Sequence, residues 1–331
     1  MFSTIYVEDA VAGHPRTRAL LRRSRGADVV RCERYGQVFN RRAQNFRLQK
    51  RRPALILARK AGRFLSPTPA SYGIGGDHNF YFSHMLNCIY DCRYCFLQGR
   101  YSSAHYVLFV NYEDFAGAIV EKTRSLNGSA VHYFSGYDCD SLALDPVTGF
   151  SRHFLPVFRE LPHALLELRT KSTQVRSLLS MEPLANCVVA FSFTPPACAQ
   201  ALEHRVPAVE SRFNALLRLQ EAGWRVGLRF DPLVYSDDFR AHYRGLFDWM
   251  LARIDAQRLH SVSLGGFRMP AAYFDRMARL YPRERLFASA LDGRGGMVEY
   301  REPLRSEILE FCRRELLRRL PPEKLFVCDP I

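Results

Sequence analysis

The 331-residue chain has no apolar run approaching the ~20 residues that a membrane-spanning helix needs. Residues 1–12 carry the acidic pair Glu8 and Asp9 and no apolar run with a cleavage site, so the sequence does not predict a signal peptide. No internal repeat or low-complexity segment stands out. The nine cysteines are an odd number without the regular spacing of a disulfide framework. We therefore expect a cytoplasmic protein with reduced thiols and no membrane partner.

Acidic residues are scarce in the first part of the chain. Residues 1–70 contain 16 Lys and Arg against 4 Asp and Glu, a net charge of +12 within a chain total of +14. The aromatic residues Tyr35, Phe39 and Phe46 lie among these basic residues. A basic segment of this kind binds phosphates through counterion release without reading sequence, which predicts nucleic acid, with DNA favoured, as a partner. The alternative is a solvated extension whose charge only aids solubility.

Apolar residues make up 47% of the chain, which is enough for a sizeable core. Strand-like stretches occur at residues 79–86, 130–135, 165–170, 187–193, 225–230 and 261–264, with helix-like stretches between them and at 302–320. Six strand–helix units predict a parallel α/β sheet with right-handed crossovers. Because six units fall short of a closed (β/α)8 barrel, we predict a partial (β/α)6 barrel. The expected division is a basic N-terminal extension (1–70), the barrel (71–300), and a C-terminal helix with a tail (301–331).

Three cysteines, Cys88, Cys92 and Cys95, lie within eight residues in a C-x3-C-x2-C pattern. No fourth cysteine or histidine follows at ligand spacing. A structural zinc site needs four protein ligands, whereas an iron–sulfur cube held by three cysteines leaves one iron open. The spacing favours the cube. The alternative is a zinc ion whose fourth ligand is a distant residue such as Cys139 or His132.

Active sites of such barrels lie at the C-terminal ends of the strands, and the cysteine loop follows the first predicted strand. Small or polar residues end the later strands, which lets a ligand approach the backbone. They are Ser135, Gly136, Lys171, Ser192, Asp231, Pro232, Gly265 and Gly266. We expect a cofactor to lie across this edge, with Ser135 among its contacts and Lys171 well placed to meet a carboxylate.

The cysteine pattern, with Tyr94 directly before the third cysteine, resembles the signature of the radical S-adenosylmethionine enzymes. Shorter motifs narrow the resemblance to the spore photoproduct lyase family, which reverses a thymine dimer in DNA by radical chemistry. They occur at residues 88–98, 141–145, 168–171, 191–193, 231–235 and 243–247. The resemblance implies a partial barrel of the radical S-adenosylmethionine type and a lyase activity in DNA repair.

The resemblance also implies the roles of individual residues. Cys88, Cys92 and Cys95 would bind a [4Fe-4S] cluster, and S-adenosylmethionine would chelate its open iron. An electron from the cluster, supplied by a donor such as a flavodoxin or ferredoxin, would release a 5'-deoxyadenosyl radical that abstracts hydrogen from a base. The residues that would hold S-adenosylmethionine are Tyr94, Lys171 and Ser192, and the residue that would contact the lesion is Arg294.

The chain departs from the family pattern at three positions. Tyr137 stands where well-studied members have the cysteine that returns a hydrogen atom to the product, and Cys139 follows two residues later. Phe96 and Gly295 replace family tyrosines. We expect Tyr137 or Cys139 to return the hydrogen atom. The alternatives are a radical enzyme that acts on an RNA base or a small molecule, and a non-catalytic nucleic-acid-binding protein with a structural metal.

Overall fold

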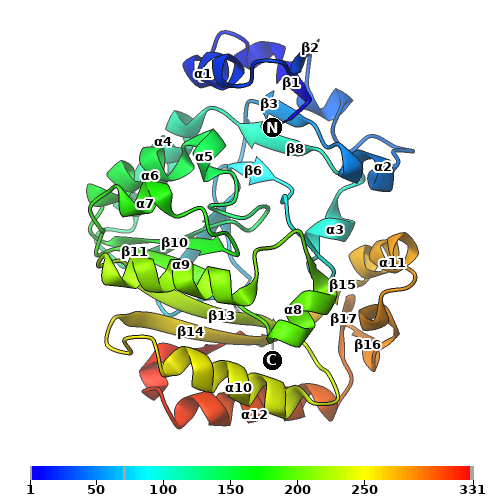
Figure 1. Ribbon diagram of the computed structural model, residues 1–331. Helices are drawn as coiled ribbons and strands as arrows, with labels where there is room; N and C mark the ends of the chain where they lie inside the picture. The colour runs from blue at the N-terminus through cyan, green and yellow to red at the C-terminus, as the bar shows by residue number, and fades with distance from the viewer. Residues whose placement is uncertain (1, 70–71, 329–331) are drawn as a thin grey trace.

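The computed structural model describes residues 2–69 and 72–328. Its largest sheet has eight strands in the order β18-β14-β13-β11-β10-β9-β5-β4 (Figure 1). All neighbouring strands are parallel except β4 and β5. The strands are β4 (Ser66–Pro67), β5 (His78–Phe82), β9 (Val131–Ser135), β10 (Ala164–Thr170), β11 (Cys187–Ser192), β13 (Arg225–Leu233), β14 (Leu259–Gly266) and β18 (Leu325–Val327).

The six strands predicted from the sequence correspond to β5, β9, β10, β11, β13 and β14, and they lie side by side in chain order. Sequential parallel strands joined by helices are what a partial barrel requires. The sequence did not predict β4 or β18, which are two and three residues long. The stretch predicted as one strand at 79–86 is divided, because β5 ends at Phe82 and β6 (Met85–Leu86) joins a second sheet.

Helices follow most of the parallel strands and cover the barrel (Figure 1). In α9, the buried residues Val209, Phe213 and Leu216 recur at the three- and four-residue spacing of one helix face. Burying each such side chain stabilises the fold by about 1.5–3 kcal/mol. The helices after residue 110 are α4 (Tyr112–Ser125), α5 (Asp145–Thr148), α6 (Phe150–Arg159), α7 (Arg176–Leu179), α8 (Pro196–Leu202), α9 (Val209–Glu221), α10 (Phe239–Leu251), α11 (Ala271–Leu280) and α12 (Leu304–Leu317). None of the helices in residues 2–69 and 72–328 combines the length and apolar character needed to cross a membrane.

The basic N-terminal segment is folded. Its strands β1 (Thr4–Glu8), β2 (Asp28–Cys32) and β3 (Leu55–Ala58) form a sheet in the order β2-β1-β3-β8-β6. The last two strands of this sheet, β8 (Tyr106–Phe109) and β6, come from residues after position 70. Strand pairing crosses the predicted boundary at residue 70, because β3 pairs with β8. The division of the chain at residues 70 and 300 stays a prediction.

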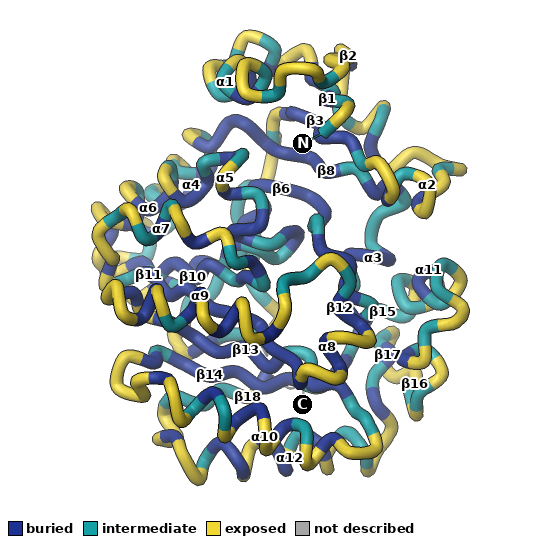
Figure 2. The backbone as a smooth tube through the Cα atoms, in the orientation of Figure 1, coloured by how far each residue is buried: buried dark blue, intermediate teal, exposed yellow. Residues whose placement is uncertain are grey.

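The surface of this N-terminal sheet is rich in exposed arginine, whereas its aromatic residues are in the core. Phe39 and Phe46 are only 5% and 6% exposed, and Tyr35 packs edge-on against Phe109 with ring centroids 5.7 Å apart. These rings are therefore not available to stack on bases. Helix α1 (Pro15–Arg23), β2 and helix α2 (Phe46–Arg51) carry much of the exposed surface (Figure 2). The exposed arginines of residues 2–69 are Arg18, Arg22, Arg23, Arg25, Arg31, Arg34, Arg41, Arg42, Arg47, Arg51, Arg52, Arg59 and Arg63.

Candidate active site

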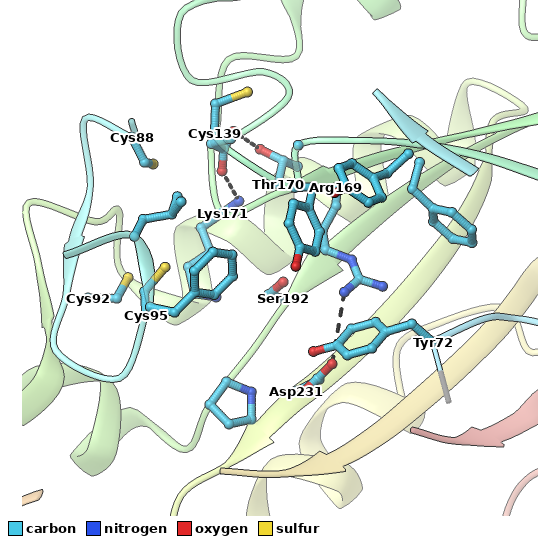
Figure 3. A pocket seen from close by; sticks show the side chains of 18 of the residues that line it. Tyr72, Cys88, Cys92, Cys95, Cys139, Arg169, Thr170, Lys171, Ser192 and Asp231 are labelled. Atoms are coloured by element: carbon cyan, nitrogen blue, oxygen red, sulfur yellow. Dashed lines mark hydrogen bonds and ion pairs between the residues drawn. The ribbon is translucent and has the colours of Figure 1, made fainter. Parts of the chain in front are cut away.

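A cavity of about 210 Å³ lies between the C-terminal ends of the parallel strands and the cysteine loop (Figure 3). Parallel strands end at the same edge of a sheet, so side chains far apart in the sequence meet there. The strand-end residues that line the cavity are Ser135, Gly136, Thr170, Lys171, Ser192, Asp231, Pro232 and Gly266. Of the ten site residues predicted from the sequence, only Arg294 is not among the lining residues.

The three cysteines lie on one side of this cavity (Figure 3). Asn87 begins their loop in the left-handed conformation (φ 69°), and its amide donates to two backbone carbonyls at 2.7 and 2.8 Å. Strand β7 (Asp91–Cys92) pairs antiparallel with β12 (Glu203–His204). The Cys95 N–H then donates to the Cys92 carbonyl at 3.1 Å, which closes a turn. The loop is thus held by hydrogen bonds of its backbone and of the Asn87 side chain.

The thiols have the chemistry of a site for a soft metal centre. Burial is the largest cause that raises the pKa of Cys88, Cys92 and Cys95, so without a metal the thiols stay protonated. Metal binding would deprotonate them. Three thiolate ligands on one short loop beside a cavity fit an iron–sulfur cube with one open iron.

The zinc alternative has less support. Within residues 2–69 and 72–328, no group of three or more His, Cys, Asp or Glu side chains is arranged to hold a single metal ion. A cube of four irons spreads its cysteine ligands further apart than one zinc ion does. His132, at the start of β9, does not line the cavity.

A buried carboxylate, Glu203, positions two of the predicted cofactor residues. Its side chain accepts hydrogen bonds from the hydroxyls of Tyr94 and Thr194, the latter at 3.0 Å. Arg212, which is fully buried, pairs with Glu203 at 2.6 Å and donates to the Ser192 carbonyl at 2.8 Å. Buried hydrogen bonds of this kind are strong and specific, so they fix Tyr94 and the end of β11 relative to each other.

Asp140 orders the end of β10. Its carboxylate accepts from the Thr170 hydroxyl at 2.7 Å and from the Lys171 N–H at 2.6 Å. Burial raises the pKa of Asp140, and these hydrogen bonds act in the opposite direction. The Lys171 ammonium lies 5.4 Å from the centre of the Tyr94 ring. Lys171 therefore faces the cysteine-loop side of the cavity, with its backbone held by Asp140.

Below the cavity, Glu167 binds two arginines. Arg229, fully buried, pairs with Glu167 at 2.7 Å, and Arg169 pairs with it at 3.0 Å. Arg169 also lies 3.9 Å from Asp231, which lines the cavity (Figure 3). Although burial acts to raise the pKa of Glu167, Arg229 and Arg169 hold it at about 2.

The two candidate hydrogen donors have different environments. Tyr137 is half-buried, lines the cavity and stacks on Tyr81 with ring centroids 4.1 Å apart. Cys139 also lines the cavity but is only 5% exposed and packs in the main core. In Figure 3 its sulfur points away from Cys92 and Cys95. Gly136, at φ 88°, makes this turn possible, because a Cβ there would lie 2.7 Å from the Ser141 hydroxyl.

Arg294 lies outside the cavity, on a hairpin next to it. Strands β16 (Leu291–Arg294) and β17 (Met297–Tyr300) are joined by Gly295 and Gly296, both with positive φ. Such a two-residue turn favours glycine, which accounts for Gly295 in place of the family tyrosine. Strand β17 also pairs with β15 (Arg268–Pro270), whose first residue lines the cavity.

Comparison with known proteins identifies relatives along most of the chain. The family model for spore photoproduct lyase matches residues 4–289. The spore photoproduct lyase of Bacillus subtilis (strain 168) is 22% identical over 267 residues, which cover 78% of this chain and 75% of that protein. A double mutant of spore photoproduct lyase with bound AdoMet and dinucleoside spore photoproduct superposes with a TM-score of 0.86 at 17% identity, covering 99% of this chain and 98% of that one. Spore photoproduct lyase complexed with dinucleoside spore photoproduct gives 0.84 at 17% identity, covering 100% and 99%.

The partial barrel and the three-cysteine loop at its strand ends define a radical S-adenosylmethionine enzyme, a class that uses S-adenosylmethionine and a [4Fe-4S] cluster. Because the family model spans residues 4–289, the chain belongs to the spore photoproduct lyase family. The likeness to the solved structures confirms the partial barrel predicted from the sequence.

Sequence reasoning missed the residues that support the site from behind. Glu203, Arg212 and Glu167 belong to no motif, yet each is buried and pairs with a charged partner. One signal was present for Arg212, which lies three residues after Val209 and four before Leu216 and therefore on the apolar face of α9. A charged residue at such a position is rarely buried without a partner.

Proposed function

We propose that this protein is a radical S-adenosylmethionine lyase that repairs a thymine-dimer photolesion in DNA. The observation that carries the proposal is the single cavity shared by the cysteine loop and the polar strand ends, in a member of the spore photoproduct lyase family. The related double mutant of spore photoproduct lyase holds AdoMet and a dinucleoside spore photoproduct, which are the corresponding cofactor and lesion. We expect the enzyme to act in the cytoplasm, where thiols stay reduced.

Cys88, Cys92 and Cys95 would hold the cluster. When bound, the cluster supplies the electron that cleaves S-adenosylmethionine and yields the 5'-deoxyadenosyl radical. Around it, Tyr94, Ser135, Lys171 and Ser192 would orient S-adenosylmethionine. The ammonium of Lys171 suits the cofactor carboxylate, and the small Ser135 leaves room for the cofactor beside the backbone.

Tyr137 is the hydrogen donor that the geometry supports best. Its ring lines the cavity, whereas Cys139 is buried in the core with its sulfur turned away from the cysteine loop. In the proposed step the O–H bond of Tyr137 breaks, the hydrogen atom passes to the carbon radical of the product, and an oxygen-centred radical stays on Tyr137. Stacking on Tyr81 holds the phenol in place for this transfer.

DNA would bind through the exposed arginines of the N-terminal sheet, and Arg294 would contact the lesion at the hairpin. A base inside a duplex cannot reach the cavity, so the lesion must be extruded at a cost of a few kcal/mol. A crosslinked base unstacks more easily, which favours damaged sites. We also propose a one-electron donor such as a flavodoxin or ferredoxin, since the net charge of +14 would attract an acidic carrier.

A second candidate is the same radical chemistry on another substrate, such as an RNA base or a small molecule. Tyr137 in place of the donor cysteine, with Phe96 and Gly295 in place of tyrosines, favours it.

The first test is anaerobic reconstitution of the wild type and of Cys92→Ala, followed by iron counting and visible spectroscopy. We expect about four irons per wild-type chain and loss of the cluster in the variant. A colourless wild type with about one zinc would refute the proposal. The reduced wild type should then form 5'-deoxyadenosine and repair spore photoproduct in an oligonucleotide, as measured by mass spectrometry. Cofactor cleavage without repair would favour the second candidate.

The hydrogen donor needs a separate test with Tyr137→Phe and Cys139→Ser. We expect Tyr137→Phe to keep cofactor cleavage and to lose most of the repaired product, because the product radical is no longer quenched. Cys139→Ser should keep both cofactor cleavage and formation of the repaired product. The reverse pattern would assign the role to Cys139.

A further inference from the structure

Lys50, from helix α2 of the basic N-terminal segment, is buried against the cysteine loop. Its side chain is only 11% exposed. Its ammonium donates to Gln98 Oε1 at 2.9 Å and lies 3.7 Å from Asp91 Oδ1. Lysine is almost never buried without such partners, because its charge is costly to remove from water. The buried ammonium of Lys50 is therefore held by Gln98 and Asp91.

Both partners of Lys50 belong to the segment that holds the cysteines. Asp91 directly precedes Cys92 in β7. Gln98 is 2% exposed, and its N–H donates to the Cys95 carbonyl at 3.1 Å. The Lys50 side chain thus reaches two points of the loop, one beside each of these cysteines.

The charge of Lys50 interacts with the thiols of Cys88 and Cys95, and it acts to lower the pKa of Cys95. Burial and Arg205 lower the pKa of Lys50, whereas Asp91, Cys88 and Cys95 act to raise it. Thiolates of a bound cluster would strengthen the second effect and keep the ammonium protonated. The electrostatic interaction between Lys50 and the thiols is little screened, because the group is removed from solvent.

Asp91 is not paired with Lys50 alone, because it also has a closer cation. Arg93 pairs with Asp91 at 2.6 Å, and Glu284 lies 3.8 Å from Arg93. Removing Lys50 would leave Asp91 paired with Arg93. The loop would then lose one positive charge while its remaining ion pairs persist.

We propose that Lys50 is a positioning residue that raises the reduction potential of the cluster held by Cys88, Cys92 and Cys95. The inference rests on the proposed function, since it requires the cluster. A cluster gains one negative charge on reduction, and a fixed nearby cation stabilises the reduced form. Net charge, hydrogen bonding and solvent exposure set the potentials of such clusters. The N-terminal segment would therefore assist electron entry as well as bind a polyanion.

The test is a redox titration of the reconstituted protein, followed by electron paramagnetic resonance, with Lys50→Met, Lys50→Arg and Arg51→Met. In Lys50→Met we expect the ratio of reduced to oxidised cluster at a fixed potential to fall about tenfold, equivalent to ~59 mV for a one-electron couple. Lys50→Arg should keep the wild-type ratio. Arg51→Met removes an exposed charge from the same helix and should also keep it. If Lys50→Met does not fold, Lys50→Gln, which keeps a donor without the charge, replaces it.

Equal ratios in the wild type and in a folded, charge-free Lys50 variant would overturn the proposal. So would a folded Lys50→Gln that takes up no iron, because Lys50 would then support cluster assembly rather than set the potential. A wild type that assembles no cluster would instead refute the proposed function, so the two failures are distinguishable by iron content.

Discussion

Arginine has different surroundings in the N-terminal segment and in the barrel. In the N-terminal segment, residues such as Arg22 and Arg25 are exposed to solvent. In the barrel, Arg212 and Arg229 have fully buried side chains that pair with Glu203 and Glu167. Exposed charges are screened by salt and can meet a partner's phosphates, whereas buried ones fix the groups around them. The same residue type is therefore available to a partner in one region and fixes site geometry in the other.

The buried arginines give the largest expected effect. Arg229→Met leaves Glu167 buried with Arg169 as its remaining cation, and we expect a loss of about 3–5 kcal/mol in the free energy of unfolding. Urea unfolding followed by circular dichroism measures it. The exposed Arg25→Met is the matched control and should change stability by at most about 0.5 kcal/mol. Equal losses in the two variants would remove the distinction between the regions.

The ion pair between Arg229 and Glu167 predicts that the free energy of unfolding depends on pH. Folding lowers the pKa of Glu167 from its ordinary value of 4.5 to about 2. A carboxyl group whose pKa is lowered by folding contributes its full stabilisation when the pH is above its pKa in the unfolded state. This stabilisation is lost as the pH falls from about 4.5 to about 2. The contribution at neutral pH is about 3 kcal/mol.

Glu167→Gln provides the measurement. Unfolding free energies of the wild type and the variant, compared from pH 7 to pH 3, should differ most at neutral pH and converge on acidification. A constant difference across this range would mean that the charge of Glu167 is not the cause.

The difference between the two sheets also marks how far the sequence could be interpreted. Alternating strand and helix patterns predicted the barrel well, and the helix predicted at 302–320 corresponds to α12. The N-terminal sheet was missed because its charge suggested an extension, and because β3 pairs with β8 across about fifty residues. Long-range strand pairing leaves no local signal.

The site follows the same pattern. Residues in motifs or at strand ends, such as Cys92 and Lys171, could be predicted because spacing and topology place them. The contacts of Lys50 and Glu203 could not, since each depends on a partner far away in the chain. Burial of a charge is a property of the folded protein.

A smaller effect on the free energy of unfolding is expected at Tyr94, whose neutral hydroxyl donates to the buried carboxylate of Glu203. Tyr94→Phe removes the hydroxyl that donates to Glu203 and should cost about 1 kcal/mol, because Thr194 and Arg212 still satisfy the carboxylate. Affinity for S-adenosylmethionine, measured by calorimetry on the reconstituted protein, should also fall. Tyr300→Phe is the control: its hydroxyl accepts from the Tyr235 N–H at 2.9 Å outside the cavity, so it should leave that affinity unchanged.

The exposed arginines give the smallest effect on stability. Arg22→Gln combined with Arg25→Gln should change the free energy of unfolding by at most about 0.5 kcal/mol per site. If both side chains contact phosphates, the slope of log K for DNA against log salt should become shallower by about 2, since each contact contributes about 0.9. Binding titrations at several salt concentrations measure this slope. Arg218→Gln with Arg225→Gln removes two exposed charges from the barrel, one of them at the start of β13 and therefore at the edge opposite the cavity, and should leave the slope unchanged. An equal change from both pairs would mean that DNA responds to net charge alone, and the N-terminal sheet would then have no special part in binding.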